Sequence, residues 1–144
     1  MPEFILEVGE TNAATALFES LDAFTQGYIE AMFFTSTGPD NEEEGLGEAE
    51  VSQFALSALQ LIKADCAAWQ AEHADLLALA YARDYDEEQA GRDYWYEPQG
   101  HGVGFRDRKA LEADGLADRL DKAAGRDDSN MLYRGDDGLL YFGW

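Results

Sequence analysis

Apolar residues recur at helical spacing through much of the first eighty positions, and this periodicity constrains the fold more than any other feature of the chain. Residues 12–34 carry apolar side chains at intervals of three and four, which predicts an amphipathic helix. Residues 48–80 continue the pattern over a length about three times that of an average helix. We therefore expect two helices there, with a break near Glu72–Ala74.

Strand and turn signals appear in the second half of the chain, first within residues 91–108. The run Tyr94-Trp95-Tyr96 favours an extended strand, and Pro98-Gln99-Gly100 is typical of a turn. The segment is predicted to form a hairpin, with Trp95 and Phe105 as its apolar anchors. Four residues are assigned structural roles in this hairpin: Asp93, Trp95, His101 and Phe105.

The C-terminal region adds a helix and a second hairpin. Residues 109–125 show an amphipathic helical pattern that Gly115 can divide. Residues 130–142 contain Asp136-Asp137-Gly138, a strong hairpin turn signal. Helices followed by hairpins favour an α+β fold, in which N-terminal helices pack on a small antiparallel sheet of C-terminal hairpins. At 144 residues, we expect residues 1–144 to form a single domain.

Several classes of protein and site are disfavoured. No apolar run reaches the length of a membrane span and the acidic N-terminus does not have the pattern of a signal peptide, so we expect a cytoplasmic protein. The single cysteine, Cys66, excludes an intramolecular disulfide and is expected in the core. The glycines at 100, 102 and 104 do not match a dinucleotide fingerprint, and "DYDEE" lacks the glycine and the final glutamate of a calcium loop. No catalytic residue, metal site or cofactor is predicted.

Charge is the outlier in the composition, because thirty acidic residues face ten basic ones and the formal net charge is −20. Lys63 is the only base in the first 72 residues, and residues 38–50 form an acidic loop with six carboxylates and no base. Three explanations fit this surplus. The charge can serve solubility or life in high salt, it can form a carboxylate-rich surface that binds a basic partner in place of nucleic acid, or it can bind cations.

Several stretches together form a recognisable pattern: "ADCAAWQAEHADLL", "AGRDYWYEPQGHGVGFRDR", "GLADRLDKAA" and "LYRGDDGLLYF". This pattern, over residues 64–142, resembles a family of small uncharacterised proteins of bacteriophages and mobile elements. The resemblance is carried by an Asp-aromatic-Trp run, a His-Gly-X-Gly-Phe return and a Gly-Asp-Asp-Gly hairpin. Tyr96-Glu97-Pro98 stands where Leu-Thr-Arg is more usual, which removes a base and adds an acid. The resemblance implies a phage or mobile-DNA context but no mechanism; that context and the charge together suggest an anti-CRISPR or anti-restriction role.

Charge and context together lead to a functional hypothesis. We expect a non-enzymatic, phage-encoded inhibitor that mimics DNA and occupies a basic nucleic-acid-binding surface of a host defence complex, either a CRISPR effector or a restriction enzyme. Direct DNA binding is disfavoured at this net charge. The predicted partner-binding acids are Glu42, Glu43, Glu44, Glu48 and Glu50, with Glu3, Glu7 and Glu10 as additions.

Two alternative functions remain open. The first is a non-enzymatic accessory protein of phage DNA metabolism. The second is a small hydrolase or metal protein centred on His101, with Asp93 and Asp107 as its acids.

Overall fold

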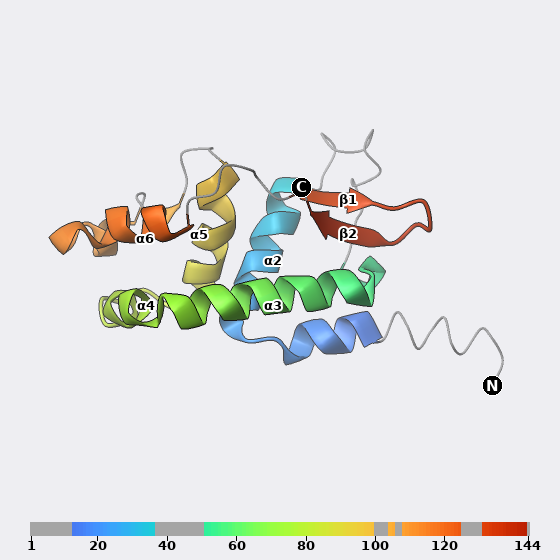
Figure 1. Ribbon diagram of the computed structural model, residues 1–144, viewed down its shortest axis with the longest axis horizontal. Coiled ribbons are helices and arrows are strands. Elements are labelled where there is room, and N and C mark those ends of the chain that lie inside the picture. The colour runs from blue at the N-terminus through green and yellow to red at the C-terminus, as the bar shows by residue number, and fades with distance from the viewer. Residues whose placement is uncertain (1–12, 37–50, 100–103, 106–107, 125–130, 144) are drawn as a thin grey trace.

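The computed structural model describes residues 13–36, 51–99, 104–105, 108–124 and 131–143, and it confirms an α+β fold (Figure 1). Within these residues, a helical segment at 13–20 is followed by helices, 3₁₀ turns (η) and two strands. They are α2 Ala23–Ser36, η2 Val51–Gln53, α3 Leu56–Glu72, α4 Ala74–Tyr81, α5 Glu87–Gln99, η4 Lys109–Leu111, η5 Ala113–Gly115, α6 Leu116–Ala124, β1 Met131–Arg134 and β2 Leu140–Gly143. In Figure 1, α3 runs along the length of the molecule and the strands lie toward one end of it.

The predicted helix over residues 12–34 is two helices, because the chain breaks at Leu21 and Asp22. The Asp22 side chain explains the second start. Its Oδ1 accepts a hydrogen bond from the backbone N–H of Thr25 at 2.8 Å, which is the arrangement of an N-cap. A short polar side chain that can satisfy a free backbone N–H therefore begins α2 in the middle of an otherwise continuous apolar pattern.

The predicted break near Glu72–Ala74 is confirmed. α3 ends at Glu72, α4 begins at Ala74, and His73 between them has non-helical backbone angles. The predicted helix over residues 109–125 is α-helical only from Leu116 to Ala124, because the residues before it form 3₁₀ turns. The predicted division at Gly115 is confirmed, since Asp114 and Gly115 both adopt positive φ at the end of η5, just before α6 begins. Trp69 links α3 to α6, because its indole N–H donates a hydrogen bond to the carbonyl of Ala123 at 3.0 Å.

The predicted hairpin over residues 91–108 is wrong in its first strand, because residues 91–99 belong to helix α5. Gly91, Tyr94 and Trp95 are buried together with Ala90, a spacing that a helix produces and a strand does not. Asp93 and Trp95 are therefore helical residues, and Phe105 lies in a turn rather than in a return strand. His101 lies outside the described residues.

α5 packs mainly against α2, and two glycines allow the helices to touch through their backbones (Figure 1). A Cβ atom on Gly91 would lie 1.8 Å from the carbonyl oxygen of Phe24, and one on Gly27 would lie 2.2 Å from that of Glu88. Any side chain at either position would push the helices apart. The close crossing overrides the β-propensity of the Tyr-Trp-Tyr run, because the helical form buries Tyr94 and Trp95 at this contact.

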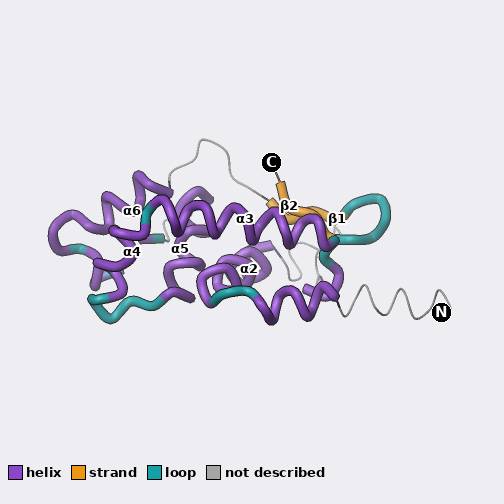
Figure 2. The backbone as a smooth tube through the Cα atoms, turned by 60° about the horizontal axis from the view of Figure 1, so that its bottom comes forward, coloured by secondary structure: helices purple, strands orange, loops and turns teal. Residues whose placement is uncertain are grey.

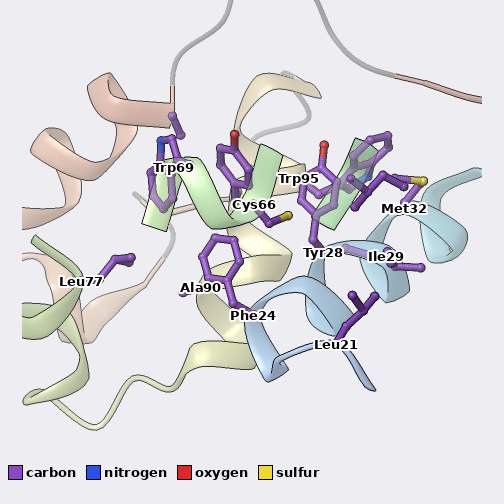
Figure 3. Close-up of a cluster of buried hydrophobic side chains, with 14 of the residues drawn as sticks. Leu21, Phe24, Tyr28, Ile29, Met32, Cys66, Trp69, Leu77, Ala90 and Trp95 are labelled. Carbon is purple, nitrogen blue, oxygen red and sulfur yellow. The ribbon is translucent and has the colours of Figure 1, made fainter. Parts of the chain in front are cut away.

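The core is built around aromatic rings contributed by α2, α3 and α5 (Figure 3). Trp69 stacks on Tyr94 with ring centroids 4.5 Å apart and also contacts Phe24 and Phe105. Trp95 meets the ring of Tyr28 edge to face. The expectation that Trp95 and Phe105 are buried is confirmed, as is the expectation that Cys66 lies in the core.

The C-terminal hairpin is confirmed in the described residues 131–143. β1 pairs with β2 in antiparallel register, with Tyr133 opposite Tyr141, and the connecting turn includes Gly138 with a φ of 83°. The sheet of the described residues consists of these two strands alone (Figure 2). It is joined to the start of α3 by a hydrogen bond from the N–H of Ala55 to the carbonyl of Leu140 at 2.9 Å.

Candidate functional site

Asp93 is the only charged side chain that is fully buried among the described residues, and it lies at the centre of a hydrogen-bond cluster. Its carboxylate accepts hydrogen bonds from the Tyr85 hydroxyl at 2.6 Å and from the Gln89 amide at 3.2 Å. The guanidinium of Arg108 donates to both carboxylate oxygens at distances between 2.8 and 3.2 Å. The ion pair is therefore bidentate and is supported by two further donors.

This arrangement satisfies the Asp93 carboxylate completely. Burial and the negative charge of Asp93 both raise the pKa of Tyr85, so the phenol stays neutral and remains a donor. An acid held in this way by Tyr85, Gln89 and Arg108 has no lone pair free for a metal ion or for proton transfer to a substrate. Asp93 therefore connects α5 to the segment that carries Arg108, and it does not fit the role of an acid in a His101-centred hydrolase.

Two hollows open on the surface beside this cluster. The first has a volume of about 440 Å³ and is lined by Asp84, Asp86 and Glu88, among other residues. The second has a volume of about 350 Å³ and is lined by Glu30, Phe34 and Tyr96, among others. Both hollows share the side chains of Gln89, Arg92 and Arg108. We call this pair of hollows and the residues named in this paragraph the polar cleft.

The two arginines of the polar cleft are paired with acids. Arg92 bridges Glu88 on its own helix and Glu30 on α2, while Arg108 pairs with Asp93. Lys109 is a third base beside the first hollow. Four acids line the two hollows against three bases, and Asp93 behind Arg108 is a fifth acid. The local potential is therefore negative, and an incoming cation is favoured over an incoming anion.

One rim of the polar cleft is apolar. Phe34, near the end of α2, is 79 % exposed, more than any other large hydrophobic residue in the described part of the chain. It lines the second hollow together with Tyr96 and the paired arginines. A ring exposed to this degree contributes little to the core. Phe34 therefore forms an apolar part of the surface beside the second hollow.

The predicted partner-binding acids fall on parts of the chain that the structure does not describe. Glu42, Glu43, Glu44, Glu48 and Glu50 lie outside the described residues, as do Glu3, Glu7 and Glu10. The prediction for these residues therefore stays a prediction. Among the described residues, no group of three or more histidine, cysteine, aspartate or glutamate side chains could hold a metal ion.

Sequence reasoning missed Tyr85, Gln89 and Arg92 because it placed Asp93 on a strand. Gln89 and Asp93 are spaced four residues apart, which places both polar groups on one side of a helix, whereas Tyr85 lies in the chain just before α5 and has no such signal. That spacing was a usable signal, but it has meaning only once residues 87–99 are recognised as helical.

Comparison with protein-family models, with curated proteins and with solved structures found no match for this chain. No helix in the described part of the chain is both long and apolar enough to cross a membrane.

Proposed function

We propose that this protein is a non-enzymatic acidic inhibitor that mimics DNA. It would act in the cytoplasm of a bacterial host, where it would occupy the basic nucleic-acid-binding surface of a defence complex, either a CRISPR effector or a restriction enzyme. The observation that carries the proposal is the excess of thirty acidic residues over ten basic ones, a formal net charge of −20. A surplus of this size gives the surface a potential complementary to a cleft that evolved to hold phosphates.

The ion pairs of the fold support this proposal. Arg83 pairs with Asp114, and Arg92 and Arg108 are paired within and beside the polar cleft. Arg134 donates to the carbonyl of Gly138 and to the side chain of Gln53. These four arginines are used to hold elements together, so they do not form a cationic patch suited to a phosphate backbone.

Exposed acids in the described residues are spread over several elements. Asp75 lies on α4, Glu87 on α5, Glu112 between the two 3₁₀ turns and Asp136 in the hairpin turn. Each faces solvent, and none has an ion-pair partner in the described part of the chain. Spread in this way, their charge adds to the long-range attraction of a basic surface, but these acids do not by themselves form a DNA-like array.

The choice of a defence complex as partner rests on sequence context. The resemblance of residues 64–142 to phage and mobile-element proteins favours a setting in which blocking a host nuclease is useful. In that setting the acidic segment at Glu42, Glu43 and Glu44 is the proposed centre of contact, because it combines the densest run of acids with the absence of any base.

The proposal is tested by neutralising that segment. In the triple variant E42Q/E43Q/E44Q, binding to a CRISPR effector or restriction enzyme should weaken at least tenfold by calorimetry near 100 mM salt, a tenfold change being about 1.4 kcal/mol. The matched control is E19Q/E72Q/E112Q, which removes the same charge from exposed positions elsewhere and should weaken binding less than threefold. Equal losses in the two variants would remove residues 42–44 from the contact.

A further inference from the structure

We infer that the polar cleft, with Phe34 at its rim, is a docking surface for a basic protein that presents an apolar recess between its cationic side chains. The inference rests on the proposed function, since it takes a basic partner as given. The inference adds which described residues hold that partner, and it adds that the partner must offer an apolar recess as well as positive charge.

The first argument is the exposure of Phe34. Phe34 is 79 % exposed. The next most exposed large hydrophobic residues in the described part of the chain are Leu61 and Leu79, at 49 % and 47 %. Leu61 and Leu79 lie on α3 and α4, while Phe34 lies on α2 beside a hollow. An aromatic ring next to a recess is a frequent energetic centre of a protein interface, because it can be fully desolvated when the partner arrives.

The second argument is the charge around the ring. Arg92 is neutralised by Glu30 and Glu88, and Arg108 is neutralised by Asp93. Asp84 and Asp86 remain exposed at the mouth of the first hollow, where the exposed Lys109 balances one of the two charges. A lysine or arginine side chain fits a recess of about 440 Å³, and the acids at its mouth are complementary to that charge. Over the two hollows together four carboxylates line the surface against three bases, which disfavours a phosphate group relative to a cation.

The third argument is continuity. The two hollows share Gln89, Arg92 and Arg108, so the apolar rim and the acidic mouth belong to one surface. Along α5, the distance from Asp86 to Tyr96 is about 15 Å at the helical rise per residue. An apolar anchor surrounded by polar contacts is the usual arrangement at the centre of an interface. The partner therefore needs cationic groups and an apolar recess within the same span.

Two peptide probes of equal charge separate the apolar contact from simple charge attraction. One is a decapeptide of alternating arginine and leucine, and the other alternates arginine and serine. Fluorescence anisotropy at about 50 mM and 150 mM salt measures their affinity for the whole protein. We expect the wild-type chain to prefer the leucine peptide about tenfold. In F34S the preference should fall below about twofold, and in the matched control L61S it should stay unchanged, because Leu61 is exposed on a different element.

A second pair of variants tests the acidic mouth. D84N/D86N should weaken both peptides at least threefold, whereas E72Q/D75N, which removes two exposed charges from α3 and α4, should have a smaller effect. Thermal unfolding of F34S should match that of the wild type, which confirms that the substitution acts on the surface.

The outcomes distinguish this inference from the proposed function. If F34S keeps the preference for leucine, or if L61S loses it equally, the docking surface is wrong while the acidic-inhibitor proposal stands. Equal effects of D84N/D86N and E72Q/D75N would also remove the cleft from the contact. If neither peptide binds at about 50 mM salt, charge attraction itself fails, and the docking surface fails with it.

Discussion

At the scale of single residues, the pair formed by Asp93 and Arg108 is the most consequential contact of the described structure. Moving a carboxylate out of water is costly, and the attraction of a partner offsets that cost only when the remaining lone pairs are satisfied. Tyr85 and Gln89 satisfy them here. The pair therefore fixes Arg108 against α5. It also fixes the segment of chain that leads from Arg108 into η4.

Removing the charge of Asp93 should destabilise the fold strongly. In D93N, Arg108 keeps its place but loses its counter-charge, and we expect a loss of about 3 kcal/mol in the free energy of unfolding, measured in urea by circular dichroism. D136N, which alters an exposed carboxylate in the hairpin turn, should change the free energy of unfolding far less. A loss below about 1 kcal/mol in D93N would show that the ion pair does not hold this segment.

Asp22 gives a pH-dependent prediction at the same scale. Partial burial raises its pKa, but hydrogen bonds from Thr25 and Gln70 outweigh burial, so its pKa in the folded protein lies below the ordinary value. A carboxylate with a lowered folded pKa stabilises the protein above its unfolded pKa, near 3.9, and that contribution disappears as the pH falls through the folded pKa.

D22A should therefore cost about 1 kcal/mol at pH 7, because the N-cap of α2 is lost. The difference from the wild type should shrink between pH 7 and the lowest pH at which the protein still folds, because the wild-type carboxylate becomes protonated as the pH falls through its lowered folded pKa. D22S, which keeps an oxygen at the cap, should be close to the wild type at pH 7 in urea unfolding. A deficit in D22A that is the same at both pH values would contradict the role given to the charge.

At the scale of elements, the crossing of α2 and α5 organises the molecule, and it depends on Gly27 and Gly91. Helix propensity alone predicts that G91A gains about 1 kcal/mol. The structure predicts the opposite sign, because the new Cβ would meet the carbonyl oxygen of Phe24. We expect a loss of at least about 2 kcal/mol in urea unfolding.

The control for that variant is G115A. Gly115 has a φ of 68° and open space around the position of a Cβ atom, so only backbone strain opposes the substitution, at about 1 kcal/mol. If G91A were no more destabilising than G115A, α2 and α5 would not be in backbone contact.

The same crossing explains how much of the fold the sequence could predict. The break between α3 and α4, the division at Gly115 and the C-terminal hairpin depend on local signals, and all three were predicted correctly. α5 was not, because Tyr94, Trp95 and Tyr96 favour a strand locally and become helical only against α2. The polar cleft was missed for the same reason, since the positions of Arg92 and Asp93 depend on α5 being a helix. Local pattern reveals elements, whereas this site arises from the contact between two of them.

At the scale of the whole molecule, a formal net charge of −20 affects stability and, under the proposed function, recognition of a partner. Self-repulsion weakens the compact state, and salt screens it over a Debye length that falls to about 3 Å at 1 M. If the charge serves a partner, the urea midpoint should rise between about 50 mM and 500 mM sodium chloride and then level off. A midpoint that climbs steadily through several molar salt would favour adaptation to high salt instead.

The most direct test of the central claim is displacement of DNA. A labelled duplex is bound to a CRISPR effector complex or a restriction enzyme, and this protein is added while fluorescence anisotropy reports the fraction of duplex that remains bound. The account predicts that near-stoichiometric protein releases the duplex at about 100 mM salt, that release weakens as salt rises, and that the protein alone leaves the free duplex unaffected. Failure to release DNA from any effector or restriction enzyme at low salt, or binding of the protein to the duplex itself, would contradict it.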